Sequence, residues 1–394
     1  MGTWVGSKKV AVLPCIALHP GIPAPPVDFM AKVQRRIFFD PDPNTGIDRS
    51  LRRYLFTVSY GRAVLDAEVL DPVTINWRQD ANSSDPADPT VGAQIADSRV
   101  EAIGLAQPRI ANYEFVMVIF PKVSGVNFLP AYAFFENKNS YMFLDNPIGA
   151  WAMELLHIAT GFGDLYIDPR NPLPDRPLTP GNLDEMDTAG AMHPSTFTKL
   201  SMGWLDANSV QVVDQGISST HIIHPLALLQ PPPPGRSTAL KIPLLDRANH
   251  YLLVESREWV DDYDRNTPGL AEGVPMEGVT IYDVDESISP PLWLRGQGLI
   301  VGDSYIDDSQ RFRIDVTKRF QGGGFQLTVQ PLPEPQRCTQ IRSELADAKA
   351  QIRDLQAQLH EPGANKPDMV AQIKELNAQV AILISESTAR HCRI

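Results

Sequence analysis

The spacing of apolar and polar residues divides the chain into three zones. In residues 1–205, short apolar runs such as residues 115–120 alternate with polar loops and with one clear helix around residues 151–157. Short apolar runs bounded by turn residues are typical of buried strands. The first zone is therefore predicted to be a mixed α/β (α+β) domain.

The second zone, residues 206–335, has a strand-like pattern and no helical periodicity. Apolar segments at residues 251–254 and 279–282 are separated by breakers, including four prolines at 231–234 and three glycines at 322–324. Such punctuation favours strands joined by turns. We expect a β-rich, sandwich-like domain here.

The third zone, residues 336–394, has the apolar spacing of a coiled coil. Apolar residues recur at alternating intervals of four and three in two stretches, which are separated by the helix-breaking residues 361–367. An antiparallel helical hairpin is predicted, and its seams provide a surface for homo-oligomerisation unless the two helices satisfy each other. The seam residues are Ile341, Leu345, Ala348, Ile352, Leu355 and Leu359, and then Met369, Ile373, Leu376, Val380 and Leu383.

A hairpin of this kind brings its two ends together, which places Cys338 beside Cys392. A disulfide between them would close a long loop and would indicate an oxidising, extracytoplasmic or secreted setting. Two unrelated free thiols are the alternative. Cys15 lies in an apolar run and is predicted to be a buried core thiol.

Bulk composition excludes several classes of protein. A chain of 394 residues favours two or three domains. Its net charge of -12 without a basic block argues against nucleic acid as a partner, and no apolar run is long enough for a membrane span. Lys8 and Lys9 followed by the apolar residues 10–18 fit either a signal peptide or a buried first strand.

The helix around residues 151–157 carries the candidate chemistry. Asn146 is expected to cap it and Pro147 to lie in its first turn, so that Met153 and His157 lie one turn apart on one face with Glu154 beside them. Zinc hydrolases place two histidines at these two positions, and the glutamate activates the metal-bound water. Methionine at the first position is a weak ligand for zinc.

Other segments surround this helix in a characteristic order. Downstream come Gly-Phe-Gly-Asp-Leu-Tyr at residues 161–166, a segment with Met186, and residues 193–205, which begin His-Pro-Ser and end Gly-Trp-Leu. Residues 50–61, 250–257 and 278–285 add three further motifs. Together they resemble the zinc metallopeptidases of the immune inhibitor A family. The resemblance implies a metzincin-like domain in which Glu154 is the general base, His157 and Asp164 bind zinc, and Met186 forms the methionine turn.

The sequence departs from that family at two points. Met153 stands where the family has its first histidine, and His157 and Asp164 are seven positions apart rather than the family's six. Because both changes weaken a zinc site, we expect a catalytically inactive peptidase fold that binds a protein or peptide ligand or serves a structural role. The alternative is an active secreted zinc endopeptidase with a substitute ligand such as His193, Asp184, Glu185 or Asp187.

Calcium is a separate possibility, since hard oxygen ligands suit that ion. Acidic residues are frequent in the loop region after the helix, although solvated loop carboxylates are the simpler interpretation. The candidates are Asp164, Asp168, Asp175, Asp184 and Asp187.

Overall fold

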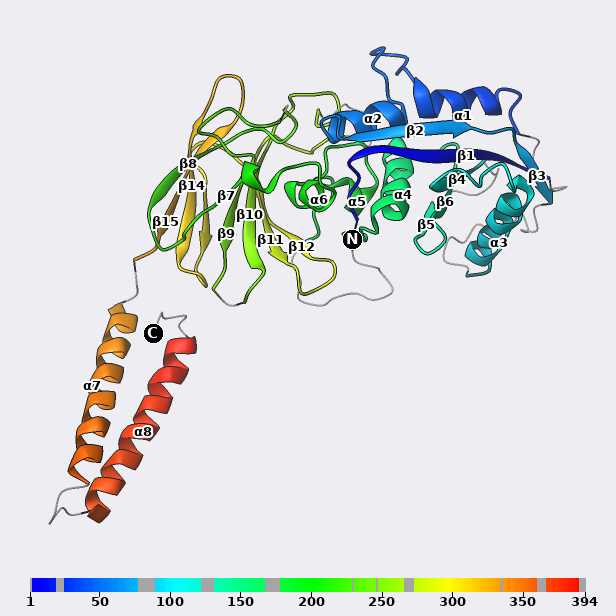
Figure 1. The fold of residues 1–394 in the computed structure, drawn as a ribbon. Coiled ribbons are helices and arrows are strands. Elements are labelled where there is room, and N and C mark those ends of the chain that lie inside the picture. The colour runs from blue at the N-terminus through cyan, green and yellow to red at the C-terminus, as the bar shows by residue number, and fades with distance from the viewer. Residues whose placement is uncertain are drawn as a thin grey trace. The chain divides into compact units, whose positions relative to one another are not determined.

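The chain folds into a mixed α/β structure with several sheets and a C-terminal pair of helices, as the sequence predicted at this level (Figure 1). The computed structural model describes residues 2–18, 25–76, 89–121, 131–166, 178–228, 230–245, 247–265, 273–333, 336–359 and 366–389. It forms two compact units. The first comprises Met1–Asp214, Thr220–Asp303 and Val316–Leu327, and the second comprises Gln215–Ser219, Ser304–Asp315 and Thr328–Ile394.

A mostly parallel six-stranded sheet organises the N-terminal part of the first unit. Its order is β2-β1-β4-β6-β5, with β3 paired to the end of β1, and only the β5–β6 pairing is antiparallel. The strands are β1 (Gly6–Leu18), β2 (Ala63–Val69), β3 (Val73–Asn76), β4 (Phe115–Phe120), β5 (Tyr132–Phe134) and β6 (Asn139–Phe143).

Both faces of this sheet are buried, which explains its continuous apolar runs. In β4, Phe115, Met117 and Ile119 join one hydrophobic cluster, and the alternate residues join another. Helices α1 (Phe29–Phe38), α2 (Leu51–Val58) and α4 (Ile148–Thr160) contribute to the first cluster, and α3 (Pro89–Ala106) contributes to the second. Figure 1 shows α1 and α3 on opposite sides of the sheet.

The strand interpretation of residues 10–18 is confirmed. They lie in β1, the strand that pairs with β2, β3 and β4. Cys15 is a free thiol with no exposed surface, as predicted, and burial raises its pKa to about 12.

A second sheet belongs to the same unit as the first. Its order is β12-β11-β10-β9-β7, made by β7 (Val210–Val212), β9 (Ala239–Pro243), β10 (His250–Arg257), β11 (Gly278–Asp285) and β12 (Leu292–Leu299). Tyr251, Leu253 and Tyr282 from this sheet enter the hydrophobic cluster that α4 also enters. Residues on both sides of position 205 therefore share one core. Two short helices and a 3-10 turn precede this sheet: α5 (Glu185–Thr188), α6 (Thr196–Ser201) and η1 (Ala207–Ser209).

A third sheet has the order β13-β14-β15-β8, and the division between the two units runs through its strands. These are β8 (Ser219–Ile223), β13 (Ser304–Asp307), β14 (Phe312–Arg319) and β15 (Phe325–Pro331). The β-rich character predicted for residues 206–335 is therefore present.

The C-terminal pair consists of α7 (Gln336–Gln358) and α8 (Lys366–Ala389). Arg337, near the start of α7, pairs with Glu386, near the end of α8, at 2.6 Å, so the helices run antiparallel. Ile341, Leu345 and Leu383 pack together at this end. Cys338 is disulfide-bonded, and its predicted partner Cys392 lies outside the described residues. In the described part of the chain, no helix is both long and apolar enough to cross a membrane.

Candidate functional site

Helix α4 presents the candidate site, and its start differs from the prediction. The helix begins at Ile148 with Pro147 at the N-cap and no side-chain cap, whereas the Asn146 side chain accepts a hydrogen bond from the Phe143 amide at 2.7 Å. Asn146 therefore closes the turn after β6 instead of capping the helix. Gly161 ends α4 in the left-handed conformation (φ 69°), which favours glycine.

Met153, Glu154 and His157 are all buried on α4, with exposed fractions of 5%, 8% and 4%. Met153 belongs to the hydrophobic core cluster together with Trp151 and Leu156. The position that carries a zinc-binding histidine in the resembled family is thus filled by an apolar side chain packed in the core.

His157 and Asp164 form an ion pair. The Nε2 atom of His157 lies 2.8 Å from Oδ1 of Asp164, and its Nδ1 atom lies 2.6 Å from the carbonyl oxygen of Phe162. A carbonyl only accepts, so Nδ1 carries a proton, and the carboxylate favours a second proton on Nε2. Burial alone would lower the pKa of His157, but the hydrogen bond and charge of Asp164 raise it overall. The seven-residue spacing therefore still brings the two side chains together.

The Glu154 carboxyl has a pKa close to neutral pH. Its pKa is raised to about 7: burial raises it most, the charge of His157 lowers it, and the charge of Asp164 raises it. A carboxyl with that pKa can exchange a proton near pH 7. Hydrolysis by this route also requires a metal-activated water, and the nearby donor set is His157 and Asp164.

The side chains around α4 do not match a catalytic zinc site, which uses three protein ligands. Two of the family's ligand positions bond to each other, and the third is the Met153 thioether. Among the described residues, no group of three or more His, Cys, Asp or Glu side chains is placed to hold a metal ion. Asp168 and Asp175, from the suggested calcium set, lie outside the described residues.

The suggested substitute ligands make other bonds. Asp184 accepts from the amides of Met186 and Ser195 and from the Thr198 hydroxyl. Glu185 accepts from the Tyr54 hydroxyl at 2.7 Å. Asp187 accepts from the Gly181 amide. These carboxylates thus organise the segment that holds Met186, whose carbonyl accepts from the Leu165 amide at 2.9 Å. Met186 itself is fully buried in α5.

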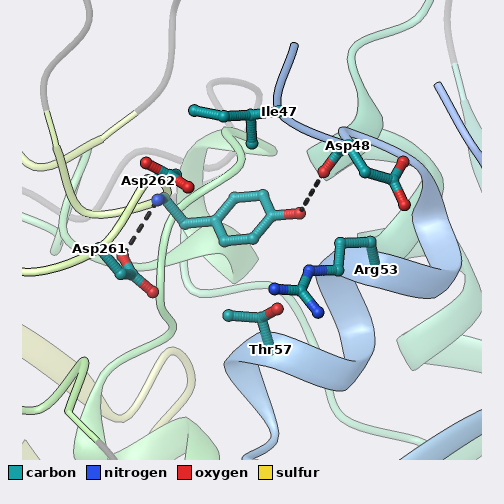
Figure 2. A pocket seen from close by; sticks show the side chains of 7 residues that line it. Ile47, Asp48, Arg53, Thr57, Asp261 and Asp262 are labelled. Carbon is teal, nitrogen blue, oxygen red and sulfur yellow. Dashed lines mark hydrogen bonds between the residues drawn. The ribbon is translucent and has the colours of Figure 1, made fainter. Parts of the chain in front are cut away.

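A cavity of about 410 Å³ lies elsewhere in the first unit (Figure 2). The sequence pattern did not identify it, because its walls come from the loop before α2, from α2 and from the loop after β10. Its lining residues are Ile47, Asp48, Arg53, Thr57, Asp261, Asp262 and Tyr263.

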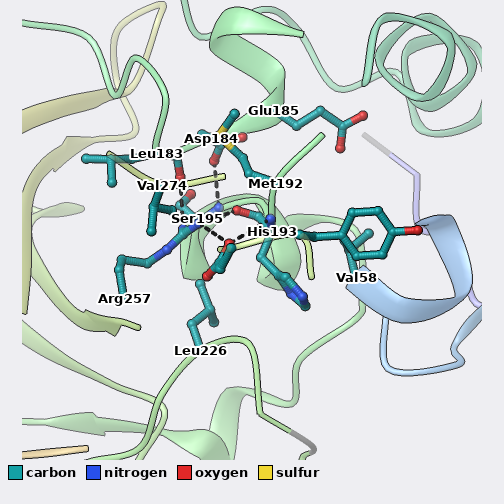
Figure 3. Close-up of polar contacts among 12 residues, drawn as sticks. Val58, Leu183, Asp184, Glu185, Met192, His193, Ser195, Leu226, Arg257 and Val274 are labelled. Carbon is teal, nitrogen blue, oxygen red and sulfur yellow. Dashed lines mark hydrogen bonds and ion pairs between the residues drawn. The ribbon is translucent and has the colours of Figure 1, made fainter. Parts of the chain in front are cut away.

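His193 is itself fully buried and belongs to a polar network (Figure 3) in which the Asp261 side chain is 23% exposed. Its Nε2 lies 2.6 Å from Oδ2 of Asp261, and its Nδ1 lies 2.8 Å from Nζ of Lys199. The guanidinium of Arg257 donates to the His193 carbonyl at 2.7 Å and pairs with Asp264 at 3.0 Å and with Glu255 at 3.2 Å. Residues from several of the motifs that resemble the peptidase family therefore bond to one another and have a structural role.

Lys199 is a base of this network whose pKa is lowered. It has no exposed surface, and burial lowers its pKa from 10.5 to about 7, against the raising effect of Asp264, Asp261 and Glu255. Between these two pH values the unfolded chain binds a proton that the folded chain does not, so stability rises with pH.

We expect the substitution Lys199→Met to remove this dependence. The difference in unfolding free energy between wild type and variant should change by up to about 1.4 kcal/mol per pH unit between pH 7 and 10, with wild type gaining as pH rises. Urea denaturation at several pH values measures it. If the unfolding free energies of the two proteins changed with pH in the same way, the lowered pKa of Lys199 would be contradicted.

Aromatic side chains that the sequence pattern did not indicate surround the α4 site. Tyr132 on β5, Phe135 just after β5 and Tyr166 after α4 are 51%, 47% and 42% exposed. The Phe135 ring meets His157 edge-on with centroids 5.5 Å apart, and Tyr166 hydrogen bonds to Asp164. Their signal in the sequence is weak, because isolated aromatics next to short strands are common in ordinary cores.

Comparison of the sequence with protein-family models and with curated proteins finds no match.

Proposed function

We propose that this protein is a non-catalytic relative of the immune inhibitor A metallopeptidases that binds an extended segment of a protein or peptide beside α4. The observation that carries the proposal is the His157–Asp164 ion pair next to a buried Met153. Two would-be ligands neutralise each other, and the third position offers an apolar thioether, which is a poor donor for zinc.

The edge of the central sheet supports the binding half of the proposal. Among the described strands, β5 pairs only with β6, and we propose that its other edge accepts an added strand. An extended peptide gains main-chain hydrogen bonds at such an edge and finds specificity through side-chain contacts. Tyr132, Phe135 and Tyr166 provide exposed aromatic surface there, which is typical of recognition sites.

The disulfide-bonded state of Cys338 favours an oxidising compartment outside the cytoplasm, where such a protein would meet its ligand.

Peptide selection tests the binding function. Full-length protein is immobilised and used to enrich a displayed library of random peptides. We expect enriched peptides to bind wild type and to bind the double variant Phe135→Ser, Tyr166→Ser at least about tenfold more weakly, since a buried aromatic contact contributes a kcal/mol or more. The matched control is Phe39→Ser, which removes a ring that is 60% exposed at the end of α1.

Equal loss of binding in the Phe39→Ser control, or no enrichment at all, would refute a binding site at β5. The alternative of an active peptidase is read from the same preparation. Stoichiometric zinc together with chelator-sensitive cleavage of casein, lost in His157→Ala, would replace our proposal with an endopeptidase that uses a substitute ligand.

A further inference from the structure

The cavity near α2 is lined by the Tyr263 ring, which neighbouring residues hold in place. Tyr263 is 2% exposed, and its ring packs edge-on against Tyr54 with centroids 5.0 Å apart. Its hydroxyl approaches the Asp48 carbonyl at 3.4 Å, and the Arg49 guanidinium lies over the ring. Ile47 adds aliphatic surface to the lining.

Two of the three carboxylates in the lining already have protein partners. Oδ1 of Asp48 accepts from the amides of Asp40 and Ser50, both at 2.9 Å. Oδ1 of Asp261 accepts from the amides of Tyr263 and Asp264, and its Oδ2 pairs with His193. Protein donors thus occupy three of the four carboxylate oxygens of these two residues.

The remaining polar groups have no such partners. Within the described chain, the Asp262 carboxylate, the Arg53 guanidinium and the Thr57 hydroxyl make no hydrogen bond or ion pair. The backbone of Asp262 is nevertheless anchored, because its carbonyl accepts from Arg49 at 3.1 Å. Asp262 and Arg53 both line the cavity (Figure 2). One uncommitted negative group and one uncommitted positive group therefore face the same space.

We infer that this cavity binds a small organic zwitterion, with its ammonium group at Asp262, its carboxylate at Arg53 and Thr57, and its carbon chain across Tyr263 and Ile47. A metal ion would meet one uncommitted carboxylate and the repulsion of Arg53. A simple anion would be repelled by the carboxylates that line the cavity. A simple cation would leave the positive charge of Arg53 without a counter-charge. A ligand with both charges satisfies both groups, and the volume of about 410 Å³ is within the range of small-molecule sites.

Three molecules of nearly the same shape test the inference on the full chain. They are 6-aminohexanoate, which carries both charges, hexanoate and hexylamine. Calorimetry or ligand-observed NMR should detect saturable binding of 6-aminohexanoate and at least about tenfold weaker binding of the other two. Glycine is a further probe, and tighter binding of glycine would show that the site prefers closely spaced charges.

Substitutions locate the site. Asp262→Asn and Arg53→Gln should each weaken zwitterion binding by about tenfold or more, and Arg52→Gln, at an exposed neighbour outside the lining, should leave it unchanged. Unchanged melting temperatures would show that the variants fold. Equal affinity for hexylamine, insensitivity to both substitutions, or no saturable binding of either zwitterion would overturn the inference.

Discussion

Replacing Gly149 with alanine is expected to destabilise the protein by about 3 kcal/mol. Gly149 lies in the first turn of α4, and an added Cβ would come within 2.2 Å of the Ala189 carbonyl oxygen and 2.5 Å of the Gly190 carbonyl carbon. Both are backbone atoms, so neither can rotate away. The helix and the segment after α5 would have to separate, and α4 is the element that holds His157.

Urea denaturation measures the Gly149→Ala effect, with Gly104→Ala as the matched control. Gly104 is also helical, in α3, but an added Cβ there has nothing within 4 Å. Alanine favours a helix over glycine by about 1 kcal/mol, so the control should be neutral or stabilising. Equal stabilities for the two variants would show that α4 does not pack on residues 189–190 as described.

Replacing Arg257 with methionine is expected to cost about 3–5 kcal/mol of stability, because it leaves buried carboxylates without their cation. Glu255 and Asp264 both pair with Arg257, and all three side chains are fully buried. The Arg257 guanidinium also donates to the carbonyls of Leu183 and His193, so its loss leaves acceptors in two further segments unpaired.

The surface pair Arg35–Asp40 provides the comparison for Arg257. The Arg35 side chain is 60% exposed, and Arg35→Met should change the unfolding free energy by about 1 kcal/mol or less. Thermal and chemical unfolding at neutral pH give both values. If Arg257→Met cost no more than Arg35→Met, the buried network would not be a structural centre of the fold.

The hairpin was the most predictable part of the chain. Its predicted seam residues are buried or half-buried in the described structure, as Ile341 and Leu383 illustrate at the end where α7 begins and α8 ends. The burial of β1 and the one-turn separation of Met153 and His157 on α4 were equally accessible from sequence. In each case the property depends on residues close together in the chain.

The cap of α4 shows where local reasoning failed. Asparagine before proline is a good cap sequence, yet Asn146 bonds to the Phe143 amide, because the turn that leaves β6 needs an acceptor there. Two local motifs competed for one side chain, and the tertiary position of β6 decided between them.

The sequence by itself determined the periodic elements, the loss of a histidine at position 153 and the placement of His157 and Asp164 in one short segment. Only the tertiary structure decided that His157 and Asp164 pair with each other, that His193 meets Asp261 and Lys199, and that Arg53 and Asp262 face one cavity. The physical reason is the range of the interactions. Periodicity records which face of a single element is buried, whereas ion pairs and cavities depend on how segments far apart in the chain are packed together.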